Sequence, residues 1–359
     1  MRSHHAPTLN LLERFTHKDR KARNRRAIWV YERGRRPRVS RDLRSECAEN
    51  GYFAGAGNGE SEDEIDFRFN SQYEVPFNQL LPAIDANLHI FESAEVREVC
   101  ARFVANLFHR ALATRRGGER LGADLTEDYR SMANDPVRLF LYTAKLSALT
   151  GRSIATGEVK EALIKGVDHY TSPEGKKALY VNDIDRATKS LSAHLVELNW
   201  STTRSSSGDD FFLSDTPVIS RATDNFGRVS FGVGIGQSAA EWILPISPRM
   251  ALRVAHRPRN SNHIDAVEMA QLNGGQIYTM SKRLYGRAYS LWIDEMVQRH
   301  AGTYQFHVDV FKGSGFVRED GFDDVMAGLP QFTELMQLRR KSPSLRGASF
   351  PAETKQNSD

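Results

Sequence analysis

The sequence lacks the residues and runs that mark a disulfide-bonded, secreted or membrane-spanning chain. Only two cysteines, Cys47 and Cys100, occur in 359 residues, which is too few for a disulfide framework or a cysteine-based metal site. No uninterrupted apolar run approaches the roughly 18 residues of a membrane span, and the N-terminus has no apolar signal core. These absences predict a cytoplasmic protein with reduced thiols, no metal site and no membrane partner.

The residues that are present indicate an ordinary soluble fold. Hydrophobic residues make up 40% of the chain and charged residues 26%, within the range of globular proteins. The length exceeds that of a typical single core, so we expect one composite domain over residues 1–330. A polar tail at 340–359 is expected to be disordered. We find no internal repeat, and no motif identifies a cofactor.

Acidic residues are scarce near the N-terminus. Residues 1–45 hold 14 Lys or Arg against four Asp or Glu, a net charge of +10, whereas the remainder carries 35 basic and 41 acidic residues, a net charge of −6. Such a local field attracts polyanions. We therefore predict that nucleic acid or a nucleotide binds at the basic run Arg20, Lys21, Arg23, Arg25 and Arg26. A solvated basic loop explains the same charges, and no aromatic nucleic-acid-binding signature accompanies them.

Helical periodicity dominates the first half of the chain. Apolar spacings predict a helical layer over 61–198, whose first helix is expected to be kinked or interrupted at Pro76 and Pro82. The clearest helix begins after Ser93, and the run Arg115–Gly118 is expected to end it.

The β-forming segments lie on either side of this helical layer. A strand is expected at 27–34, and short β-rich runs separated by turn residues occupy 199–311, with a helix at about 264–281 between them. The order predicts an α+β fold, in which a mixed, mainly antiparallel sheet is packed against a helical layer.

Two short motifs resemble sites of chemistry but have plainer explanations. Gly232, Gly234 and Gly236 lie among strands, whereas a dinucleotide-binding loop leads from a strand into a helix, so we interpret them as a hairpin or bulge. Arg102 and His109 are about two helical turns apart and are similar to an element of helical ribonucleases. A pair of surface residues explains this spacing equally well.

Several stretches, taken together, are similar to the motifs of one known family. They are "HAPTLNLLERF" (5–15), "SQYEVPFNQLL" (71–81), "RFVANLFHRAL" (102–112), "FFLSDTPV" (211–218) and "LPISPRMAL" (244–252), followed by a helix that bears Asn273. Over roughly residues 5–285 the chain resembles the bacterial family catalogued as domain of unknown function 4238. It resembles a divergent member, because the Gln, Thr and Pro of the family's core helix are replaced.

The resemblance implies no established activity, but it groups four polar residues within otherwise apolar motifs: His5, Glu74, Arg110 and Asp215. Buried charges are costly unless they are paired, so we expect one shared cluster. An enzyme would use His5 as general acid or base, Asp215 or Glu74 to orient it or bind a metal, and Arg110 to hold a phosphate. This hypothesis predicts a hydrolase or transferase that acts on nucleic acid or a nucleotide.

The alternative is a non-catalytic nucleic-acid-binding or protein-interaction module. Arg110 would then pair with Asp215 or Glu74 and clamp the helical layer to the sheet. An Asx-type turn before Pro217 explains Asp215 by itself. A role in phage defence is a further hypothesis, which rests on the basic run and on the bacterial character of the family.

Overall fold

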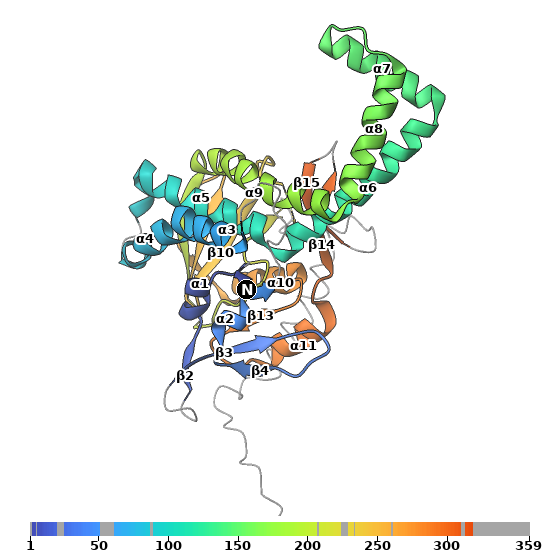
Figure 1. Ribbon diagram of the computed structural model, residues 1–359. Coiled ribbons are helices and arrows are strands. Elements are labelled where there is room, and N and C mark those ends of the chain that lie inside the picture. Colours follow the sequence, from blue (N-terminus) through green and yellow to red (C-terminus); the bar gives the residue numbers. More distant parts are fainter. Residues whose placement is uncertain are drawn as a thin grey trace, which may run out of the picture.

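The computed structural model describes residues 2–4, 6–19, 25–50, 61–86, 89–206, 208–223, 229–232, 234–259, 261–309 and 313–318. Figure 1 shows a body in which helices lie over β-sheets, and an arm that projects from it. The arm consists of α6 (Leu112–Asn134), α7 (Pro136–Thr150) and α8 (Thr156–Thr171). The expected α+β class is confirmed.

A six-stranded sheet forms one layer of the body. Its order is β12–β6–β11–β10–β8–β9, and its neighbours are antiparallel except for the parallel pair β12 and β6. Strand β10 buries seven of its eight residues, as expected for a strand covered on both faces. The strands are β6 (Asn199–Ser205), β8 (Ile219–Thr223), β9 (Val229–Phe231), β10 (Ala240–Ser247), β11 (Met250–Ala255) and β12 (His263–Ile264).

A second sheet joins N-terminal strands to strands from the other end of the chain. Its order is β2–β3–β13–β7, and β4 also pairs with β3. Its strands are β2 (His17–Asp19), β3 (Arg25–Tyr31), β4 (Arg38–Ser40), β7 (Leu213–Ser214) and β13 (Leu284–Gly286). Two pairs complete the described β-structure: β1 (Arg2–His4) with β5 (Ala48–Asn50), and β14 (Tyr304–Asp309) with β15 (Gly313–Arg318).

The described β-part thus forms two main sheets, where the sequence predicted one. The segment Asp215–Val218 carries the chain from β7 in the second sheet to β8 in the six-stranded sheet. Pro217 has no N–H group with which to extend a ladder, so strand pairing stops at this point.

The helical layer is built around α5 (Ala94–Arg110). Phe103 of α5 stacks on Phe77 with ring centroids 3.9 Å apart, and Phe108 packs 4.7 Å from Trp242 of β10. The first contact joins α4 to α5, and the second joins α5 to the six-stranded sheet. The other helices of the body are α1 (Leu9–Arg14), α2 (Leu43–Glu46), α3 (Glu62–Phe69), α4 (Val75–Ala86), α9 (Pro173–Val196), α10 (Ala266–Thr279) and α11 (Leu291–His300).

One predicted helix boundary is wrong. The run Arg115–Gly118 lies within α6, and the break falls earlier, at Ala111, whose backbone is extended. Each helical glycine costs about 1 kcal/mol relative to alanine, and the packing of α6 against α8 offsets this cost. Pro82 lies inside α4, which continues to Ala86.

The glycine segment from Gly232 onward joins β9 to β10, and no helix follows it. Gly232 has a φ of 79°, a left-handed conformation that side-chain-bearing residues rarely adopt. The segment therefore lacks the strand-to-helix geometry of a dinucleotide-binding loop. The tail at 340–359 lies outside the described residues. Among the described helices, none is both long and apolar enough to cross a membrane.

Candidate functional site

Arg110, the last residue of α5, is completely buried and pairs with Glu74. Its Nη1 donates to Glu74 Oε1 at 2.7 Å and to Asn106 Oδ1 at 3.4 Å, and its Nη2 lies 3.8 Å from Asp66 Oδ1. The guanidinium also lies over the ring of Phe69, 5.2 Å from its centroid. A buried cation is thus balanced by a carboxylate at hydrogen-bonding distance, as buried charges require.

A π-helical segment, Asn70–Glu74, directs Glu74 toward Arg110. This segment lies between α3 and α4, which form one continuous helical run. Pro76 follows it and has no N–H to donate to the carbonyl four residues earlier, so α-helical bonding is interrupted here. The interruption expected at Pro76 therefore takes the form of a wider turn.

Asp215 is buried and accepts hydrogen bonds from the loop that follows α10. Its Oδ1 accepts from the backbone N–H of Ser281 at 2.8 Å, and its Oδ2 accepts from that of Arg283 at 3.1 Å. The backbone N–H of Asp215 donates in turn to the carbonyl of Arg283 at 3.0 Å. Burial raises the pKa of Asp215 to about 6, although these N–H groups favour the ionised form.

Helix α10 fixes the rest of this segment through two amide side chains. Asn273 Oδ1 accepts from the N–H of Phe212 at 2.9 Å, and Gln276 Oε1 accepts from the N–H of Ser214 at 2.9 Å. Gln276 Nε2 donates to the carbonyl of Pro217 at 2.8 Å. The polar side chains of "FFLSDTPV" and of α10 therefore hold the backbone in place where the chain passes from the second sheet to the six-stranded sheet.

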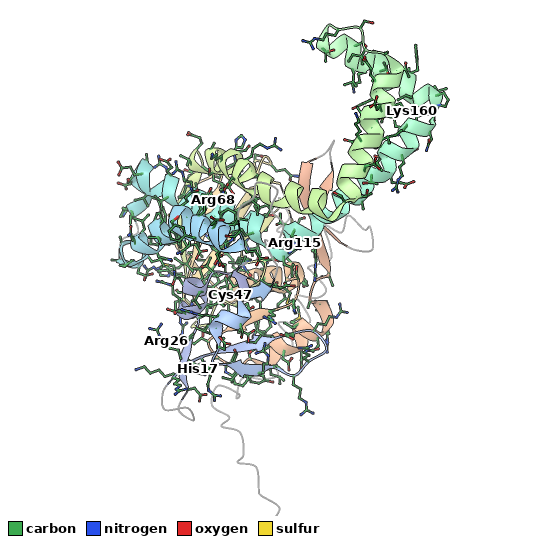
Figure 2. The ribbon with its side chains drawn as sticks, in the orientation of Figure 1. His17, Arg26, Cys47, Arg68, Arg115 and Lys160 are labelled. Carbon is green, nitrogen blue, oxygen red and sulfur yellow. The ribbon has the colours of Figure 1, made fainter. Side chains whose placement is uncertain are left out.

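Cys47 and Tyr285 are both fully buried and belong to the same apolar core. Burial, with the charge of Glu74 as the next cause, raises the pKa of the Cys47 thiol to about 12. Burial also raises the pKa of Tyr285 well above its ordinary value, with the charge of Asp215 as the next cause and Cys47 among the smaller ones. Figure 2 labels Cys47 in the body, below the helices of the upper layer. The charges of Glu74 and Asp215 thus each act on a side chain of this apolar core.

His5 lies outside the described residues, so its place relative to Arg110 and Asp215 is not part of this geometry. Its neighbours His4, which pairs with Ala48, and Ala6, which is buried, are described. The catalytic roles expected for His5, Glu74, Arg110 and Asp215 stay predictions.

A second buried ion network is not evident from the sequence. Glu46, only 3% exposed, accepts from both terminal nitrogens of Arg38, at 2.6 and 2.9 Å. Glu32 accepts from Arg283 Nε at 3.1 Å and from Arg38 at 3.3 Å. In the sequence these buried charged residues look like exposed ones, apart from the position of Glu32 at the end of a predicted strand. The network could therefore not be predicted from the sequence.

Ion pairs also neutralise part of the basic N-terminal charge. Arg14 pairs with Asp85 at 2.7 Å, Arg26 with Glu13 at 3.0 Å and Arg41 with Asp19 at 2.5 Å. Among the predicted nucleic-acid-binding residues, Arg25 and Arg26 are exposed at the start of β3, whereas Arg20, Lys21 and Arg23 lie outside the described residues. Arg26 thus remains exposed despite its ion pair.

An aromatic pair lies on the same face of β3 as Arg25. Residues of a strand alternate between its faces, so Arg25 and Trp29 share one face. Trp29 is half-buried, and its ring lies 5.3 Å from that of Tyr289, which is 38% exposed. Trp29 pairs across the ladder with Gly286 of β13, and Tyr289 follows three residues later. We call Arg25, Trp29 and Tyr289 the aromatic–basic surface; the sequence did not reveal it because Tyr289 is distant in the chain.

The described residues contain no group of three or more His, Cys, Asp or Glu side chains arranged to hold a metal ion. In comparisons with known proteins, the family described as "Protein of unknown function (DUF4238)" matches residues 4–295. No curated protein and no solved structure matches the chain.

Proposed function

Because the chain belongs to this family of unknown function, we propose a function from the chemistry of its own surface: it binds single-stranded nucleic acid. The bases would stack on Trp29 and Tyr289, and the phosphates would lie along Arg25, Arg26 and the preceding basic run. Exposed aromatic rings beside cations are the usual platform for unpaired strands, because every base has a π-face.

The observation that carries this proposal is the pairing of Trp29 with Tyr289 on the strand face that also bears Arg25. Charge alone would fit a solvated loop equally well, but a partly exposed aromatic pair adds a stacking surface that a loop does not need.

In this proposal Arg110, Glu74 and Asp215 hold the scaffold and do not touch nucleic acid. The hydrogen bonds from Arg110 to Glu74 and from the 281–283 loop to Asp215 support this role. We place the activity in the bacterial cytoplasm and, as part of the same hypothesis, in phage defence. Unchanged phage plaquing after expression would count against that setting.

The test is binding of a labelled single-stranded oligonucleotide to the full chain, followed by fluorescence anisotropy at several salt concentrations. Trp29→Leu and Tyr289→Leu keep apolar bulk but remove stacking, and each should weaken binding about fivefold or more. Neutralising Arg20, Arg23, Arg25 and Arg26 should reduce the salt slope by roughly 0.7 for each phosphate that the chain no longer neutralises.

Two matched variants serve as controls. Arg102→Ala removes an exposed arginine from α5, and Phe67→Ala removes an aromatic ring that is 72% exposed on α3. Neither should change affinity. Binding that is absent, insensitive to salt, or equally weak in the controls contradicts the proposal.

The catalytic hypothesis is the second candidate, because a carboxyl group with a pKa of about 6 can exchange a proton near neutral pH. The same labelled probe distinguishes the two candidates. Cleavage or transfer that Asp215→Asn abolishes, while binding is kept, would favour a hydrolase or transferase. An intact probe after prolonged incubation favours the binding module.

A further inference from the structure

Helix α7 at the end of the arm exposes an apolar face. Val137, Phe140 and Leu141 are 67%, 64% and 62% exposed, and their spacing of three and four residues places them side by side on the helix. Ala144 and Ala148 are also exposed and continue the same face. The opposite face of α7 is occupied: Leu139 is buried in a core with Val159 and Leu163 of α8.

The charge around this face has one sign. Residues 136–157 contain Arg138, Lys145 and Arg152, all exposed, and no Asp or Glu. The acidic residues on either side are engaged at helix ends, since Asp135 accepts from the N–H groups of Val137 and Arg138, and Glu158 accepts from that of Ala155. Residues 136–157 thus combine exposed apolar side chains with cations, and the two carboxylates lie at the ends of this segment.

Among the described residues, the position of α7 leaves this face open to a flat partner. Figure 1 shows α7 at the far end of the arm, away from the sheets and the other helices of the body. With 15 residues it is about 22 Å long, shorter than the roughly 30 Å of a bilayer's hydrocarbon core. It cannot span a membrane, but its length suffices to lie along one.

We propose that the arm tip docks on an anionic lipid surface, with Val137, Phe140 and Leu141 inserted between the lipids and Arg138, Lys145 and Arg152 against their headgroups. An amphipathic helix with basic residues beside its apolar face lies in the membrane interface in this way. The expectation of no membrane partner rested on the absence of a spanning segment, which docking of this kind does not need.

Charge favours lipid over a second copy of the chain as the occupant. Arg138 and Lys145 are seven residues apart and therefore lie on the same flank of α7. In an antiparallel pair of α7 helices related by a two-fold axis, these flanks would meet and set like charges against each other. An anionic lipid surface neutralises them instead.

The test is co-sedimentation of the full chain with vesicles of phosphatidylcholine and phosphatidylglycerol, compared with vesicles of phosphatidylcholine alone. The chain should bind the anionic vesicles, and the double variant Phe140→Glu/Leu141→Glu should bind about tenfold or more weakly. Replacing Arg138 or Lys145 by Ala should weaken binding about fivefold each, since a cation near such a surface contributes about that factor. Phe67→Glu, at an equally exposed ring on α3, is the matched control and should bind normally.

A gain-of-signal variant keeps the test independent of folding defects. Leu141→Trp should give a blue-shifted fluorescence emission when anionic vesicles are added, and light scattering should report the same mass before and after the glutamate substitutions. No binding to anionic vesicles, or equal binding by the double glutamate variant, overturns the proposal. A dimer that the glutamate substitutions dissociate also overturns it, in favour of a second copy.

Discussion

At the scale of single residues, we expect the stability of the helical layer to depend on the buried ion pair between Arg110 and Glu74. Arg110 is fully buried and Glu74 is 8% exposed, so neither charge is well solvated. Removing one partner of such a pair leaves a buried charge uncompensated, whereas replacing both by apolar residues avoids that cost.

We therefore predict that Glu74→Gln lowers the free energy of unfolding by about 3–5 kcal/mol, since Asp66, 3.8 Å from Arg110, is more distant than Glu74 and compensates the buried charge less well. The double variant Glu74→Leu/Arg110→Met should lose less than the sum of Glu74→Leu and Arg110→Met. Urea unfolding of the parent, the two single variants and the double variant measures this coupling. Additive losses would mean that the pair does not act as a unit.

Asp215 is predicted to make stability depend on pH. Its pKa is raised to about 6 in the folded state from 3.8, so the folded chain holds its proton over a range in which the unfolded chain has released it. The contribution of Asp215 to stability is therefore greatest below pH 4 and is lost as the pH rises from about 4 to about 6.

The measurement is urea unfolding of the parent and Asp215→Asn at pH 5 and pH 7.5. Because Asn does not titrate, the stability difference between the two proteins should shrink by about 1 kcal/mol at the higher pH. Asp215→Asn should be less stable than the parent at both pH values, since its NH2 group cannot accept a hydrogen bond from the N–H of Ser281 or Arg283. A difference that is constant between the two pH values contradicts the assignment.

At the scale of elements, the second sheet depends on close packing at β13. A Cβ atom on Gly286 would lie 2.3 Å from the ring of Phe212, a distance that real side chains do not reach. Phe212 is itself 5% exposed and packs edge-on against Tyr31, with ring centroids 5.9 Å apart. Only glycine therefore lets β13 lie between β3 and β7 with this core intact.

Gly286→Ala should lower the free energy of unfolding by about 1–3 kcal/mol through overpacking. Adding Phe212→Leu should recover part of the loss, because the smaller side chain vacates the space. Gly157→Ala is the control: a Cβ there has no neighbour within 4 Å, so stability should be unchanged or slightly higher. Thermal unfolding measures the stability of each of these variants. If Gly286→Ala leaves the stability unchanged, the packing argument is wrong.

Helical elements were easier to predict than their ends. The apolar spacing of α5 could be recognised from the sequence, because a helix repeats every 3.6 residues regardless of its tertiary contacts. Its end at Arg110 was not, because the run Arg115–Gly118 carries the usual stop signals and yet lies within α6. Tertiary packing of α6 on α8 outweighs the local cost of the glycines.

At the scale of the whole molecule, the two proposed binding surfaces lie at opposite ends. Figure 2 labels Arg26 at the lower end of the body, near the aromatic–basic surface, and Lys160 on the arm above. A chain held to lipid by the arm tip would thus leave the aromatic–basic surface open to nucleic acid. The variants at Phe140 and Leu141 should accordingly leave oligonucleotide affinity unchanged.

The sequence by itself determined the α+β class, the long helices and the family, because periodicity and short motifs are local properties of the chain. The two-sheet arrangement, the choice of Glu74 for Arg110 and the meeting of Trp29 with Tyr289 were decided only by the tertiary structure. The physical reason is that strand pairing and ion pairing join residues far apart in the chain. From the sequence, Asp215 and Glu74 were equally suitable carboxylates, and only the three-dimensional path of the chain set one of them 2.7 Å from the guanidinium.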